Sequence, residues 1–301
     1  MQSFHNDPTL KAEIAQRLKA HAEAGEIVGA PTHWKDGKGS PAACMIDDRS
    51  LVHWQQRLGI PKAIGSLVDT VAMYAVTPEG AGKFGQEWLA AAPVGRDLRS
   101  AANALLIWIL SDPAQGVVHY ASSDIERSMI DRIADLHRQG RAGEGPAAAT
   151  WRAAREAAMA ATDGLASEMA KAVGRAVEAA AWDPATTATV LSDTARSWIA
   201  VHSQSAVASF GWTEDDDRAM HARLKGLFDA AKESGAAPET INVFALLEQQ
   251  HPEEAARLRA RNAMERRIPT TCAQALGARL IELIGATTSS DGCAVALESA
   301  P

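Results

Sequence analysis

The side chains best suited to chemistry gather between residues 33 and 53. This stretch combines imidazoles, an indole, a thiol and carboxylates with flexible backbone, in His33, Trp34, Gly37, Gly39, Cys44, Asp47, Asp48 and His53. A thiolate and imidazoles can bind a metal ion, and a cysteine beside a histidine base can act as a nucleophile. The catalytic candidates are therefore Cys44, His33 and His53, which are also the weak candidates for metal ligands. Their spacing matches no compact zinc module, so we expect no metal site, and the sequence identifies no cofactor.

Each of these residues also has an ordinary structural interpretation. A single cysteine often packs as a small hydrophobic side chain, and Asp47 or Asp48 can cap the helix that carries Leu51. Redox sensing by Cys44 is a third interpretation. The structural interpretation is favoured, and whether the protein is an enzyme stays open, with the balance against it.

The candidates lie in or just after a long segment rich in helix breakers. Residues 25–48 contain four glycines and two prolines, which predicts irregular structure. A connection of this length between helices is often functional. We therefore expect a ligand-binding surface in which Trp34 supplies contact area and the glycines allow close backbone approach. The residues expected to form it are His33, Trp34, Gly37, Gly39, Cys44 and Asp47.

Three short motifs lie in this segment and in the sixty residues after it. They are Gly37 to Cys44 (GKGSPAAC), Leu58 to Pro61 (LGIP) and Ala92 to Leu98 (APVGRDL). With them the chain resembles a group of uncharacterised bacterial and phage-associated proteins, in which a G-x-G-C-x-x-G-C loop precedes L-G-I-P and I-P-V-G-x-D-L. The resemblance covers roughly residues 5 to 110 and implies no activity. Ser40 stands at the first cysteine of that pattern, which argues against a paired-cysteine metal site or disulfide in this loop.

The elements that must position these residues are helical. The 301 residues are 47% hydrophobic, rich in alanine and without β–α–β alternation, which predicts an all-α, two-layer, multi-helical protein. Breakers at residues 139–146 predict a linker between two helical subdomains, 1–140 with its loop 25–48, and 146–285, followed by a frayed tail, 286–301. Helices are expected near 8–24, 48–57, 61–74, 78–92, 97–111, 122–139, 147–182 (long or once broken), 185–209, 214–233, 239–249, 252–265 and 270–284.

Charge and motif context disfavour a nucleotide or nucleic-acid ligand. The net charge of −7 argues against a broad phosphate-neutralising surface. The strip Arg257–Arg267 could contact nucleic acid, but glutamates stand at pairing distance within it, which favours a solvated, ion-paired face. Gly80 to Gly85 spells G-x-G-x-x-G, yet Thr77-Pro78 predicts a helix start there instead of the strand that a dinucleotide site needs.

The sequence also favours a particular compartment. The N-terminus has no apolar signal segment, and the longest apolar stretch, 101–110, is too short to cross a membrane. Three dispersed cysteines, Cys44, Cys272 and Cys293, are typical of a reducing compartment, so we expect a cytoplasmic protein.

The preferred hypothesis is an accessory protein, bacterial or phage-derived, that binds a protein partner or a small ligand through loop 25–48. Its alanine-rich second half would act as a scaffold or as the interface of a homo-oligomer. One alternative is a Cys/His-dependent enzyme or metal-binding protein centred on Cys44, His33 and His53. Another is a nucleic-acid-interacting regulator that uses the strip Arg257–Arg267.

Overall fold

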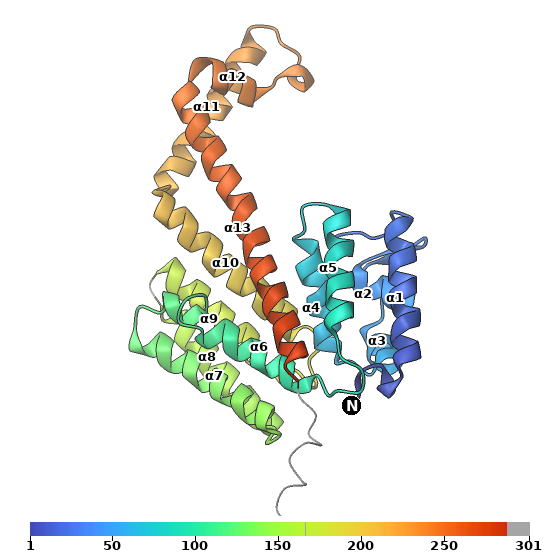
Figure 1. Ribbon diagram of the computed structural model, residues 1–301. Helices are drawn as coiled ribbons and strands as arrows, with labels where there is room; N and C mark the ends of the chain where they lie inside the picture. Colours follow the sequence, from blue (N-terminus) through green and yellow to red (C-terminus); the bar gives the residue numbers. More distant parts are fainter. Residues whose placement is uncertain (166, 288–301) are drawn as a thin grey trace, which may run out of the picture. The chain divides into compact units, whose positions relative to one another are not determined.

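The computed structural model describes residues 1–165 and 167–287, and within these the chain is almost entirely helical (Figure 1). The prediction of an all-α, multi-helical protein is confirmed. None of the described helices is long and apolar enough to cross a membrane. Cys293 and all of the predicted tail except residues 286 and 287 lie outside the described residues.

The described chain forms thirteen α-helices and three short 3-10 turns. The α-helices are α1 Pro8–Glu23, α2 Pro41–Ile46, α3 Leu51–Leu58, α4 Lys62–Met73, α5 Pro78–Ala91, α6 Arg99–Ser111, α7 Asp124–Ala142, α8 Ala148–Asp163, α9 Glu168–Ala180, α10 Val190–Phe210, α11 Glu214–Glu233, α12 Val243–Gln250 and α13 Pro252–Gly285. The 3-10 turns are η1 Ser3–Asn6, η2 Val117–Tyr120 and η3 Pro238–Thr240.

Two regions differ from the sequence-based expectation. Loop 25–48, expected to lack regular structure, contains a β-hairpin and helix α2. The hairpin pairs β1 Trp34–Lys35 with β2 Lys38–Gly39 through Asp36-Gly37, whose positive φ angles and residue types suit a tight two-residue turn. The helices expected at 252–265 and 270–284 are one helix, α13, which continues through Pro269 although proline usually ends or kinks a helix.

The chain divides into two compact units. Unit 1 comprises Met1–Val201 together with the chain from Thr270 onward, and unit 2 comprises His202–Pro269. The linker predicted at residues 139–146 lies inside unit 1. There, the ring of His137 on α7 contacts the ring of Trp151 on α8 and hydrogen-bonds the carbonyl of Ala180 on α9. Unit 2 has its own small apolar core, centred on Trp212, Leu227, Leu247, Ala255 and Leu258.

Helix α4 is the central element of the part of unit 1 that carries the candidate residues. Its residues 63–72 are all buried, and it packs against α2, α3 and α5 (Figure 1). The indole of Trp54 lies directly over Gly65, where an added Cβ would come within 2.9 Å of the ring. Burial on every side makes any polar side chain on α4 costly unless it is hydrogen-bonded, and α4 carries one carboxylate, Asp69.

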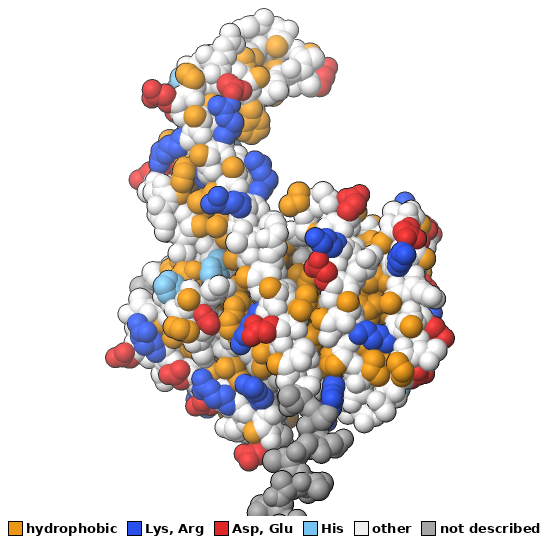
Figure 2. Space-filling view, viewed as in Figure 1, with side chains coloured by type: hydrophobic (Ala, Val, Ile, Leu, Met, Phe, Trp, Pro, Cys, Tyr) orange, Lys and Arg blue, Asp and Glu red, His pale blue; other side chains and the backbone are white. Residues whose placement is uncertain are grey.

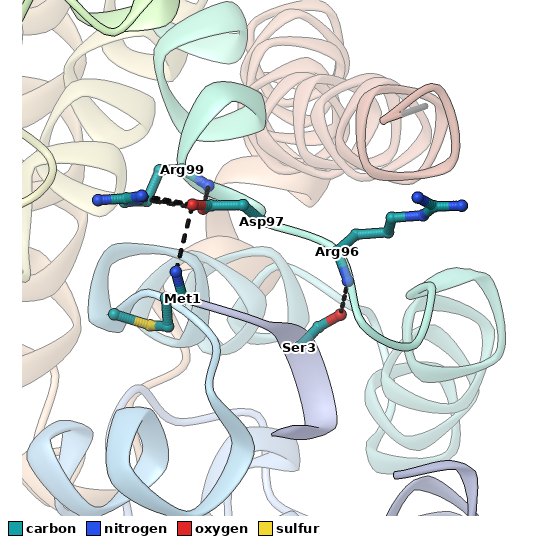
Figure 3. Close-up of polar contacts among 5 residues, drawn as sticks. All are labelled: Met1, Ser3, Arg96, Asp97 and Arg99. Carbon is teal, nitrogen blue, oxygen red and sulfur yellow. Dashed lines mark hydrogen bonds and ion pairs between the residues drawn. The ribbon is translucent and has the colours of Figure 1, made fainter. Parts of the chain in front are cut away.

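The first residues of the chain are built into unit 1 through backbone contacts with the segment before α6. The amide of Ser3 donates to the carbonyl of Arg96 over 2.8 Å, and its hydroxyl accepts the Arg96 amide over 3.0 Å. The ammonium group of Met1 lies 3.3 Å from the carboxylate of Asp97, which also binds Arg99 (Figure 3). These contacts hold the backbone of residues 95–99 in one conformation.

Candidate functional site

Loop 25–48 is held in one conformation by the buried carboxylate of Asp69. Its oxygens accept hydrogen bonds from three points along the loop: the Thr32 amide at 3.0 Å, the Ser40 hydroxyl at 2.7 Å and the Ala42 amide at 2.8 Å. Thr32 adopts the left-handed conformation, with φ of 52°, which turns its amide toward the carboxylate. One side chain on α4 thus fixes the start of the hairpin and the start of α2.

Burial raises the pKa of Asp69 from 3.8 to about 6, and the three hydrogen bonds only partly offset that cost. Asp69 is 1% exposed. The carboxylate has a structural role there, because without it the buried Ala42 amide would have no acceptor. Asp69 is therefore a positioning residue for the loop.

Gly39 is the centre of the small sheet. Its amide donates to the carbonyl of Glu26 and its carbonyl accepts from the amide of Val28, so the hairpin is joined to the chain that enters the loop. A Cβ at this position would lie 2.6 Å from the indole of Trp34. Gly39 therefore allows the Trp34 ring to lie close to the backbone. The sequence predicted close backbone approach by a ligand at this glycine, whereas the group that approaches is the side chain of Trp34.

Trp34 is half-buried and lies against His21 of α1, with the two ring centroids 5.5 Å apart and the ring planes perpendicular. Both nitrogens of the His21 ring are occupied, Nδ1 by Glu26 at 2.6 Å and Nε2 by Asp47 at 2.9 Å. Asp47 also pairs with Arg17 at 3.2 Å. This cluster joins α1, the hairpin and the end of α2, and it leaves His21 without a free nitrogen for acid–base chemistry.

Cys44 is not presented to solvent, which corrects the expectation that its thiol belongs to a ligand-binding surface. All six residues of α2 are buried, and Cys44 is 0% exposed. Its thiol donates to the carbonyl of Gly39 at 3.4 Å. Burial, together with the nearby charge of Asp69, raises the pKa of Cys44 to about 12. A thiol in this state provides no thiolate for nucleophilic attack or metal binding at neutral pH.

The two histidines named with Cys44 do not join it. His53 is exposed at the start of α3, where its Nδ1 pairs with Asp48. His33 is half-buried beside the hairpin, and its carbonyl accepts from the amide of Ser40. No described contact links either ring to Cys44, and residues 1–165 and 167–287 contain no cluster of three or more His, Cys, Asp or Glu side chains suited to a metal ion.

Lys35 and Lys38 form the outer face of the hairpin. They are directly opposite each other in the pairing register, and both are exposed. Like charges placed directly opposite in a sheet repel each other. Neither ammonium group has an ion pair among the described contacts, whereas the nearby carboxylates of Glu26 and Asp47 are already paired.

Sequence reasoning missed Asp69 and His21, the two residues that fix the loop. Asp69 carries a recognisable signal, because it is the one charged residue in the mostly apolar run from Ala63 to Met73. His21 carries none, since it stands on an ordinary amphipathic helix and its partners come from other elements.

The strip Arg257–Arg267 in unit 2 is largely ion-paired. Arg257 pairs with Asp216 at 2.6 Å, Arg259 pairs with Glu248, and Arg261 pairs with Glu265 at 3.0 Å. The guanidinium groups of Arg257 and Arg261 also lie over the ring of Trp212. On the face shown in Figure 2, positive and negative side chains are interspersed. These contacts do not favour a nucleic-acid interface along this strip.

The G-x-G-x-x-G sequence lies within α5, which begins at Pro78 after the capping residue Thr77. Gly85 faces Pro41, where an added Cβ would come within 2.8 Å, and Gly82 faces Ile27. These two glycines thus allow α5 to pack closely on the loop.

Comparison of the chain with protein-family models, with curated proteins and with solved structures gives no match.

Proposed function

We propose that this protein is a binding protein whose hairpin, residues 34–39, recognises an acidic segment of a partner protein. The observation that carries the proposal is the cross-strand pair of Lys35 and Lys38 on a loop that buried hydrogen bonds to Asp69 hold in place.

Charge complementarity defines the partner. The hairpin has two unpaired ammonium groups and one carboxylate, Asp36, at its turn. A carboxylate placed between Lys35 and Lys38 would replace their repulsion with two attractive contacts. Cross-strand opposite-charge contacts contribute about 0.2 to 1 kcal/mol each, so an acidic side chain gains from both lysines.

Shape supports the same assignment. Trp34 is fixed between Gly39 and His21 and is half-exposed, so it offers a rigid aromatic surface without a large loss of side-chain entropy. Successive strand residues alternate between faces, so the hairpin carries a pre-formed aromatic side chain on one face and two cations on the other. That combination suits a peptide segment with an apolar residue among acids.

The proposal is tested with the full chain and a synthetic peptide rich in Glu and Leu, using calorimetry at low and at moderate salt. We expect the peptide to bind and the affinity to fall as salt rises. The double variant Lys35→Ala/Lys38→Ala should weaken binding roughly tenfold, as the loss of two contacts of about 0.7 kcal/mol each predicts.

Lys19→Ala is the matched control, because Lys19 is an exposed lysine on the neighbouring helix α1 and pairs with Glu23. It should leave the affinity unchanged. The same peptide with Lys in place of Glu should not bind. Equal binding of both peptides, or an affinity that the double lysine variant does not change, would refute the proposal.

A further inference from the structure

A second surface, separate from the hairpin, has the chemistry of an anion site. Two adjoining cavities of about 470 and 400 Å³ open at the start of α6, and both are lined by Asp97, Ser100 and Arg141. The three shared residues line both cavities, which are together called the trough below. Its walls include Arg96 on one side and the glycine-rich segment 140–145 on the other.

The charge in this trough is mostly positive, in a chain whose net charge is −7. Arg96 is partly buried and Arg141 is exposed, and neither guanidinium has an ion pair or a hydrogen bond among the described contacts. Arg99 adds a third guanidinium. Other arginines also lack a printed ion pair, but Arg96 and Arg141 are two that line the same cavity.

Two carboxylates, Asp97 and Asp183, also line the trough, against three guanidinium groups. The carboxylate of Asp183 accepts a hydrogen bond from the Ala185 amide at 2.8 Å. Asp97 binds Arg99 in a forked arrangement and lies 3.3 Å from the Met1 ammonium group, so its own charge is already compensated (Figure 3). The Arg96 side chain extends away from this cluster (Figure 3). Arg96 is therefore available to a ligand, whereas Asp97 is occupied.

The backbone around the trough adds amide groups that can donate hydrogen bonds to an anion. Helix α6 begins at Arg99 with Leu98 as its N-cap, and the Arg99 amide donates to the carboxylate of Asp97 at 3.0 Å. The amides of Ser100 and Ala101 are in the first turn, where helical amides have no partner within the helix, and both residues line the cavity. On the opposite wall, Gly143 and Gly145 allow a bulky group to approach the backbone closely.

We infer that this trough binds a small molecule bearing phosphate groups, held by Arg96 and Arg141 and by the amides of Ser100 and Ala101. Guanidinium groups pair with phosphate oxygens through two parallel hydrogen bonds. The cavity lined by both Arg96 and Arg141, about 470 Å³, exceeds what a single phosphate fills, so a diphosphate should bind more tightly than a monophosphate.

The inference is tested on the full chain by NMR titration with inorganic phosphate and with pyrophosphate, against sodium chloride at the same ionic strength. We expect saturable shifts of the Ser100 and Ala101 amides, with pyrophosphate binding at least roughly tenfold more tightly than phosphate. Arg96→Gln and Arg141→Gln should each weaken pyrophosphate binding at least about fivefold.

Arg138→Gln is the matched control, because Arg138 lies one turn before Arg141 on α7 and pairs with Asp135. It should leave pyrophosphate binding unchanged, and thermal melting of all three variants shows whether each is folded. Equal weakening by Arg138→Gln would mean that general charge attraction, and not this trough, explains the binding. The absence of shifts beyond those caused by chloride would overturn the inference outright.

Discussion

Replacing Asp69 with alanine should loosen loop 25–48 and should do so more at pH 5 than at pH 7. The substitution leaves the buried Ala42 amide without an acceptor and the Ser40 hydroxyl with only the His33 carbonyl, 3.4 Å away. Each such donor costs about 1 to 3 kcal/mol, so we expect Asp69→Ala to lower the free energy of unfolding by about 3 kcal/mol at pH 5.

The pH dependence follows from the pKa of Asp69, which burial raises from 3.8 to about 6 in the folded protein. Between these values the folded state binds the proton more tightly than the unfolded state, so this group stabilises the fold at low pH, and that stability is lost as pH rises through about 6. The loss caused by Asp69→Ala should therefore be about 1 kcal/mol smaller at pH 7 than at pH 5.

The assay is urea unfolding of the full chain at both pH values, with hydrogen exchange of the Ala42 amide as a local readout. Thr70→Val is the control, because Thr70 is its buried neighbour on α4 and donates only to the carbonyl of Ser66. It should cost about 1 kcal/mol at both pH values. A loss for Asp69→Ala that is equal at pH 5 and pH 7, or larger at pH 7, would refute this account of the loop.

Three further predictions concern single positions. Gly39→Ala places a methyl group 2.6 Å from the indole of Trp34 and should lower stability by about 1 to 3 kcal/mol in urea unfolding, whereas Gly226→Ala, which meets open space, should not. Burial raises the pKa of Cys44 to about 12, so iodoacetamide should modify it only as fast as the protein opens, and rapid labelling seen by peptide mapping would contradict its placement. Burial lowers the pKa of His137 to about 4, so the stability that its neutral ring contributes should be lost as pH falls from 6.5 to 4. NMR of the ring should show a neutral imidazole at pH 5.5, and a charged ring at that pH would contradict the prediction.

The helices were predictable because their start signals are local. Asp7-Pro8 and Thr77-Pro78 each place a capping side chain before a proline, and α1 and α5 begin there. The same local logic failed at Pro269, where α13 continues although the proline predicts a break. A rule based only on residues close in sequence does not take account of tertiary contacts, which also decide whether a helix continues.

The candidate site was predictable only in part. Asp-Gly at 36–37 is a hairpin signal, but strands of two residues are too short to show an alternating pattern. Cys44 was a plausible ligand by type, and only the burial of all of α2 removes it from the surface. Asp69 escaped prediction because its hydrogen-bond partners lie 27 to 37 residues away in the chain. Long-range polar contacts of this kind leave no periodic trace in a sequence.

The most direct test of the recognition surface is an NMR map of the full chain titrated with the Glu- and Leu-rich peptide. We predict that the largest shifts occur at the Trp34 indole N–H and at the amides of Lys35 and Lys38, with little change on α7 or α11. Shifts centred on another surface, or none at a peptide concentration that saturates calorimetric binding, would contradict the assignment of the hairpin as the site of partner recognition.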